Sequence, residues 1–170
     1  SLANEIRQSG MPCDMFGFEP GWQTHFYSCT YKWDEERFPE HEKMLKELTD
    51  MGYKVNLWEH AYVNPDSPIY EAMEPYAGDH YVWDGLVPDF TMEEARKVFA
   101  DYHSTLIEEG VSGFKLDECD SSDFTANWGF ANFTQFPSGL DGEQMHMLFG
   151  ALYQTCCRRL RFHYHYRRGL

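Results

Sequence analysis

The sequence lacks several signatures that would assign its chemistry directly. It has no glycine-rich phosphate-binding loop and no Gly-x-Ser-x-Gly elbow, which argues against nucleotide-dependent chemistry and a serine hydrolase. Its five cysteines are an odd number without Cys-x-x-Cys spacing, so neither a zinc site nor a disulfide framework is indicated. Reduced thiols favour the cytoplasm. We therefore expect no cofactor.

Long apolar runs and basic residues are also scarce. No segment reads as a transmembrane helix or a signal peptide, so no membrane partner is expected. The chain has 14 lysines and arginines against 28 acids, for a formal net charge of −14. Five arginines fall in residues 155–170, which leaves 9 basic residues and a formal charge of −19 for residues 1–154. This strong negative charge on residues 1–154 should repel nucleic acid.

The length limits the fold that the chain can form. At 170 residues it can bury one core, whereas a complete (β/α)8 barrel needs about 250 residues. Aromatic residues make up 17% of the sequence, which suits both a packed core and a surface on which sugars stack.

Hydrophobic periodicity predicts alternating strands and helices. Strands are predicted at about 12–18, 53–58 and 111–117, and helices at 2–9, 39–51, 92–109 and 142–160, with a short helix around 68–75. Thr91 and Glu94 have the spacing of a capping box for the helix at 92–109. Strand, helix, strand, helix, strand is the order of parallel (β/α) units, so the predicted fold class is α/β.

Polar and aromatic side chains cluster where the predicted strands end. The carboxyl ends of parallel strands meet at one edge of the sheet, so these side chains should converge there. The residues expected to bind substrate at this edge are Glu19, Trp58, His60, Lys115 and Asp120. Carboxylates accept hydrogen bonds from hydroxyl groups and flat rings pack on the apolar faces of sugars, so this edge suits a polyhydroxylated ligand.

Asp117 is the candidate nucleophile, because it directly follows the apolar run that ends the third predicted strand. The alternative is that Asp117 only caps a turn. Lys115 lies two residues earlier and therefore on the same side of the strand. Its charge would lower the pKa of Asp117, unless it serves only in a salt bridge at the rim.

A metal site is the competing interpretation of the same segment. Residues 117–123 are rich in acids, and Glu59 and His60 could add ligands. The segment lacks the glycine and the terminal glutamate of a calcium loop, and we predict no metal. His60 could instead donate a hydrogen bond to a sugar hydroxyl or simply pack in the core.

Five segments together resemble glycoside hydrolase family 31. Gly-Phe-Lys-Leu-Asp at 113–117 is similar to the strand that ends in the attacking aspartate of that family. The other similar segments follow in the order of the family, at 12–19, 31–39, 44–58 and 88–96. The resemblance implies that residues 1–154 are part of a TIM (β/α)8 catalytic barrel, about three of its eight units. Residues 155–170 match nothing in the family and are interpreted as a basic tail that is truncated or non-native.

The resemblance also implies a reaction. It is the retaining, double-displacement hydrolysis of α-linked glycosides, with Asp117 as nucleophile and with Glu19, Trp58 and Lys115 lining the sugar site. Nothing after residue 120 matches the acid/base segment of the family. Glu59-His60 stands where members often have Asn-Pro, which leaves the sugar open.

The alternative is a catalytically silent barrel fragment that binds sugar or needs a partner to complete the site. A sheet of three parallel strands would have two open edges, which favours self-association.

Overall fold

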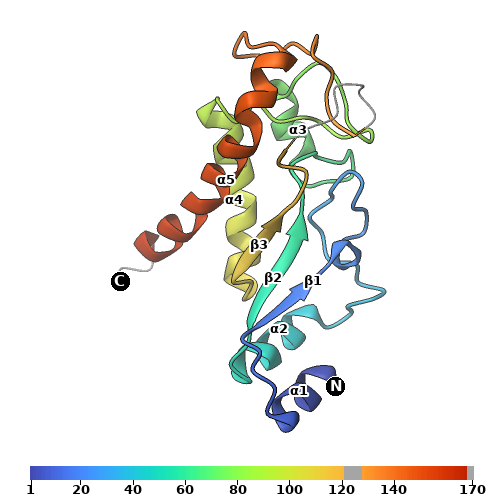
Figure 1. Ribbon diagram of the computed structural model, residues 1–170, viewed down its shortest axis with the longest axis vertical. Coiled ribbons are helices and arrows are strands. Elements are labelled where there is room, and N and C mark those ends of the chain that lie inside the picture. The colour runs from blue at the N-terminus through green and yellow to red at the C-terminus, as the bar shows by residue number, and fades with distance from the viewer. Residues whose placement is uncertain (121–127, 168–170) are drawn as a thin grey trace.

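The computed structural model describes residues 1–120 and 128–167 and confirms the predicted α/β class (Figure 1). The elements in chain order are α1 (Leu2–Ser9), β1 (Met15–Phe18), η1 (Pro20–Trp22), α2 (His41–Asp50), β2 (Lys54–Glu59), α3 (Tyr70–Met73), η2 (Glu74–Tyr76), α4 (Glu93–Glu109), β3 (Gly113–Leu116) and α5 (Gly142–Arg167).

The three strands form one parallel sheet in the order β1-β2-β3. Phe18 of β1 pairs with Leu57 of β2, and Trp58 of β2 pairs with Lys115 of β3. Helix α2 connects β1 to β2, while α3, η2 and α4 connect β2 to β3. The carboxyl ends of all three strands therefore point to the same edge, as predicted. Within the described residues, β1 and β3 each pair on one side only.

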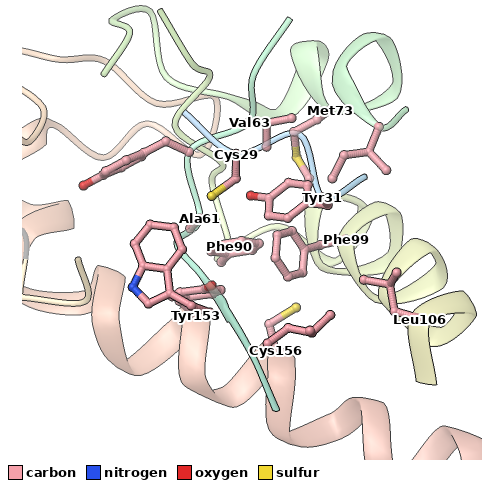
Figure 2. Close-up of a cluster of buried hydrophobic side chains, with 14 of the residues drawn as sticks. Cys29, Tyr31, Ala61, Val63, Met73, Phe90, Phe99, Leu106, Tyr153 and Cys156 are labelled. Carbon is pink, nitrogen blue, oxygen red and sulfur yellow. The ribbon is translucent and has the colours of Figure 1, made fainter. Parts of the chain in front are cut away.

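The core lies between the sheet and the helices. Leu45 and Leu48 of α2 are buried, and α2 packs against β2. Helix α4 contributes Phe99 and α5 contributes Tyr153, and Figure 2 shows both rings beside Phe90. Each fully buried side chain of this size stabilises the fold by about 1.5–3 kcal/mol relative to exposure. This packing holds the strands in place, and the polar residues lie at the carboxyl ends of these strands.

The N-terminus of α4 differs from its prediction. The cap residue is Met92 and no side chain caps the helix, so the predicted capping box of Thr91 and Glu94 is wrong. The hydroxyl of Thr91 instead donates to the buried Asp89 at 2.5 Å. The other carboxylate oxygen of Asp89 accepts the N–H of Ser138 at 3.0 Å. Asp89 thus ties α4 to the loop before α5.

The boundaries of other elements also differ, most clearly those of β1, β3 and α5. Strand β1 begins at Met15 rather than 12. Strand β3 begins at Gly113 rather than 111, because the N–H of Val111 still binds the carbonyl of Leu106 at the end of α4. Helix α5 continues to Arg167, so the predicted limit between barrel and tail falls inside a helix. Residues 168–170 of the predicted tail lie outside the described residues. In the described part of the chain, no helix is both long and apolar enough to cross a membrane.

Candidate functional site

Asp117 lies directly beyond β3 and is held by two hydrogen-bond donors. The indole N–H of Trp58, from the neighbouring strand β2, donates to Oδ2 at 2.7 Å. The backbone N–H of Glu118 donates to Oδ1 at 3.0 Å. Glu118 adopts a left-handed conformation with φ 54°, which turns the chain away immediately after the aspartate. Both carboxylate oxygens are therefore oriented, while 45% of the side chain is still exposed.

Lys115 and Glu19 lie beside this carboxylate. The ammonium nitrogen of Lys115 is 3.2 Å from Oε2 of Glu19 and 4.0 Å from Oδ2 of Asp117. The closer ion pair therefore joins β3 to the residue after β1, and Lys115 acts on Asp117 through space. Both side chains of the Lys115–Glu19 pair are well exposed, so the pair adds little stability.

The pKa of Asp117 is lowered overall. Partial burial alone would raise it, but the hydrogen bonds from Trp58 and Glu118 and the charge of Lys115 outweigh that effect. Asp117 is thus ionised at neutral pH. Glu118 shows the opposite behaviour, because burial and the nearby charges of Asp117 and Asp120 raise its pKa. Asp120 itself lies exposed in the turn that follows.

His60 lies below the surface, packed against the rings of Trp58 (5.4 Å) and Trp83 (5.3 Å). Burial lowers the pKa of His60 to about 3, so its ring is neutral. Its Nδ1 accepts the N–H of Tyr62 at 3.2 Å, which leaves the proton on Nε2. This buried Nε2 has no hydrogen-bond partner of good geometry among the described residues.

Two aromatic residues at this edge were not predicted, Tyr27 and Trp83. Their ring centroids are 4.9 Å apart, and Tyr27 also contacts Trp58 at 5.8 Å. Tyr27 is 43% exposed, and its pKa is raised by burial and by the charges of Glu118 and Asp117. Tyr27 thus lies near the carboxylates and forms an aromatic wall with Trp83 and Trp58.

A tight turn presents Trp83 to this wall. Val82 and Gly85 exchange two backbone hydrogen bonds of 3.0 and 2.8 Å, and both central residues have positive φ, 49° at Trp83 and 60° at Asp84. This is the geometry of a two-residue type I′ hairpin, for which Asp-Gly is a known signal. That signal places Asp and Gly at the two central positions, whereas Trp83 and Asp84 occupy them here, so the Asp84-Gly85 dipeptide would have placed the turn one residue too late.

Among the described residues, the side chains named for the competing metal interpretation do not come together. Glu59 is fully buried and faces the helices, away from Asp117. Asp123 lies outside the described residues. Among the residues that the structure describes, no group of three or more His, Cys, Asp or Glu side chains is arranged to hold a metal.

A cavity of about 630 Å³ lies away from the carboxyl ends of the strands, between residues 24–36, the start of α2 and the end of α4.

The edge of the sheet thus offers an ionised, partly exposed carboxylate beside a cation and a wall of aromatic rings. Of the predicted residues, Glu19, Trp58, Lys115 and Asp117 are brought together directly. A carboxylate held this way can bind hydroxyl groups or attack an electrophilic carbon.

Comparison with known proteins gives a consistent result. The family model described as the glycosyl hydrolases family 31 TIM-barrel domain matches residues 1–168. The α-xylosidase XylQ of Lactiplantibacillus pentosus is 34% identical over 125 residues, covering 66% of this chain and 16% of XylQ. The myogenesis-regulating glycosidase of Mus musculus is 31% identical over 103 residues, covering 51% of this chain and 14% of that protein. The chain therefore spans only about a sixth of the curated relatives it matches.

Solved structures agree in fold. A family 31 α-xylosidase from a soil metagenome, complexed with xylose, superposes with a TM-score of 0.77 at 16% identity, over 95% of this chain and 25% of that one. A Flavobacterium johnsoniae dextranase complexed with glucose gives 0.75 at 19% identity, over 94% and 21%. The three described strands are thus part of a TIM barrel.

Proposed function

The chain belongs to glycosyl hydrolase family 31 as part of its TIM-barrel domain, and we propose that it supplies the nucleophile, Asp117, for the retaining hydrolysis of α-linked glycosides. The observation that carries the proposal is the position of Asp117. It follows a barrel strand, where catalytic residues of this fold lie, and it is held by Trp58 and Glu118.

The proposed reaction has two displacements at the anomeric carbon. An oxygen of Asp117 attacks that carbon, and the bond to the leaving-group oxygen breaks as this oxygen takes a proton from a general acid. Water then attacks the same carbon and gives a proton to the conjugate base of that general acid, while the bond between the carbon and the Asp117 oxygen breaks and releases the sugar and the carboxylate. We assign the general acid to none of the described residues. The lowered pKa of Asp117 supports the first step, because only the ionised form can attack.

The surrounding side chains would hold the sugar. Glu19, Lys115 and Asp120 are exposed enough to exchange hydrogen bonds with hydroxyl groups. The rings of Tyr27 and Trp83 would pack on the apolar face of the sugar. His60 would donate its Nε2 proton to a hydroxyl oxygen, which would give this buried N–H a hydrogen bond of good geometry that no described residue supplies. Trp58 would act mainly by holding Asp117.

An α-xyloside is the substrate that we would test first. The support is the 34% identity to XylQ, whose name describes an α-xylosidase. The catalytically silent alternative is favoured by a different observation, namely that β1 and β3 each pair on one side only within the described residues. Such a chain would bind sugar only, or would need further strands, from a second copy or another partner, to complete the site.

The test is intact mass spectrometry of the chain after incubation with 5-fluoro-α-glycosyl fluorides of xylose, glucose and galactose. Fluoride is an activated leaving group and needs little acid assistance, so the glycosyl ester on Asp117 should accumulate. Wild type, Asp117→Ala and the control Asp50→Ala, which changes an exposed aspartate at the end of α2 away from the carboxyl ends of the strands, would be compared. One adduct, lost only in Asp117→Ala, is expected. No adduct from any sugar with a folded chain would contradict the proposal and favour the silent alternative.

A further inference from the structure

Three polar side chains are buried together behind the tip of β2. Glu59 places Oε2 at 2.8 Å from Nε2 of His103 on α4. Its Oε1 accepts the hydroxyl proton of Tyr153 on α5 at 2.8 Å. All three side chains are fully buried, and Figure 2 shows Tyr153 within the aromatic core beside Phe90. One carboxyl group thereby joins the sheet to both helices.

The hydrogen-bond partners determine how many protons this cluster holds. Nδ1 of His103 lies 2.8 Å from the carbonyl oxygen of Phe99, which can only accept, so Nδ1 carries a proton. Burial, with the charge of Glu59 contributing, raises the pKa of Tyr153 well above its usual range, so its hydroxyl stays protonated. One proton then remains between Glu59 and His103. Wherever it resides, the pair has no net charge.

The same residues of β2 hold Asp117. The carbonyl of Glu59 accepts the backbone N–H of Asp117 at 2.8 Å, and the preceding residue, Trp58, donates to its carboxylate. The flanking carbonyls are also fixed, by the Trp22 indole at 2.7 Å on Trp58 and by the Tyr31 hydroxyl at 2.8 Å on His60. The Glu59 side chain is therefore one of three anchors, beside the Trp22 indole and the Tyr31 hydroxyl, for the segment of β2 that orients Asp117.

Burying a paired carboxyl group here is costly compared with an apolar side chain, which would fill the same space without desolvating charge. Directional hydrogen bonds hold the end of β2 in one orientation, which apolar packing alone does not do. We propose that Glu59, His103 and Tyr153 are positioning residues for Asp117, and that they act through hydrogen bonds rather than through charge. The inference rests on the proposed nucleophile for its catalytic meaning, but the orientation it concerns can be measured without catalysis.

The Trp58 indole N–H is a direct probe of this orientation. In the ¹⁵N-labelled 170-residue chain its resonance would be assigned with Trp58→Phe, and its shift should follow the ionisation of Asp117. Asp117→Asn is the control that should abolish the titration. Glu59→Gln and Glu59→Met would then be compared. The glutamine can accept from Tyr153 and donate to a neutral His103, so it keeps every hydrogen bond, while methionine has similar length and keeps none.

We expect Glu59→Gln to leave the indole shift and its pH midpoint in place. Glu59→Met should move the shift towards that of a free indole, and Asp117 should bind its proton about tenfold more tightly, because a hydrogen bond to the carboxylate is weakened. A folded Glu59→Met chain with the wild-type titration would overturn the inference. Glu59→Gln behaving like Glu59→Met would overturn the hydrogen-bond basis of it.

Tyr153→Phe keeps the test decisive if Glu59→Met does not fold, since it removes a single donor from Glu59. It should shift the indole resonance in the same direction by a smaller amount, and a wild-type titration would count against the inference.

Labelling by the glycosyl fluoride separates the positioning role from the proposed function. If the wild type is not labelled but its indole titration is intact, only the proposed function is contradicted. If the wild type is labelled no faster than Glu59→Met, only the positioning role is contradicted.

Discussion

Trp58 lies on β2 and Asp117 directly follows the neighbouring strand β3, and the indole nitrogen of Trp58 is 2.7 Å from a carboxylate oxygen of Asp117. Trp58 is itself buried, with its carbonyl bound by the Trp22 indole. The donor that orients the carboxylate is therefore held by the core, while the carboxylate reaches the surface. The orientation of Asp117 thus depends on the packing of β2.

Replacing Trp58 with phenylalanine should raise the pKa of Asp117. The ring volume is largely kept, but the donor to the ionised carboxylate is lost, and a hydrogen bond to a charged group contributes about 1.5–3 kcal/mol. The rate of labelling by a 5-fluoroglycosyl fluoride would be measured from pH 3 to 7 in both chains. At low pH the labelling rate of Trp58→Phe should be at least about tenfold below that of wild type, and the midpoint of its pH profile should lie at a higher pH. An unchanged midpoint would show that the indole does not stabilise the ionised form.

Asp117 should make folding stability depend on acidity. Its pKa is lower in the folded chain than its usual value, so its contribution is present above the unfolded pKa and is lost as the pH falls through the folded pKa. Urea unfolding of wild type and Asp117→Asn would be compared between about pH 2 and 5. The difference in unfolding free energy should shrink as the pH falls. A constant difference would mean that the pKa is the same in both states.

Lys115→Met should change stability very little. The ammonium group pairs mainly with the exposed Glu19, so the expected change in unfolding free energy is within about 0.5 kcal/mol. The pKa of Asp117 should rise slightly, because Lys115 is one of the groups that lower it. Urea denaturation measures the first effect and the indole titration the second. Glu19→Gln is the matched control, and a large loss of stability from either variant would contradict this assignment.

Gly150→Ala should disturb the site from the helix side. A Cβ at Gly150 of α5 would lie 2.2 Å from the carbonyl oxygen of Cys119, two residues after Asp117. Overpacking of this kind costs about 1–3 kcal/mol. Gly17→Ala on β1, where nothing lies within 4 Å, is the control. The melting temperature should be lowered in Gly150→Ala but not in Gly17→Ala. Equal melting temperatures for the two variants would show that the turn at Cys119 moves to make room for the methyl group.

Much of the site followed from simple rules. Alternation along the strands and the parallel order placed Trp58, Lys115 and Asp117 at one edge, and the family resemblance is confirmed by the match over residues 1–168. The wall formed with Tyr27 did not follow, because its ring comes from a loop whose path has no periodicity. The partners of Glu59 did not follow either, since its contacts with His103 and Tyr153 depend on how α4 and α5 pack on the sheet.

Local competition explains the error at α4. Thr91 and Glu94 have the right spacing for a capping box, but Asp89 offers the Thr91 hydroxyl a closer buried acceptor. The spacing alone contains no information about a third residue. The extent of α5 was underestimated because its last turns lack the apolar stripe from which the earlier turns were recognised.

The left-handed backbone at Trp83 has a consequence for directed evolution. A bulky residue in this conformation costs about 1–2 kcal/mol that asparagine or glycine would largely avoid. A screen that rewards heat resistance alone should accept Trp83→Asn only if this backbone cost exceeds the packing of the ring on Tyr27 and His60, whereas a screen for sugar binding should retain the tryptophan in either case. The residue that survives at this one codon in the two screens would therefore show whether backbone strain or ring packing dominates at the turn.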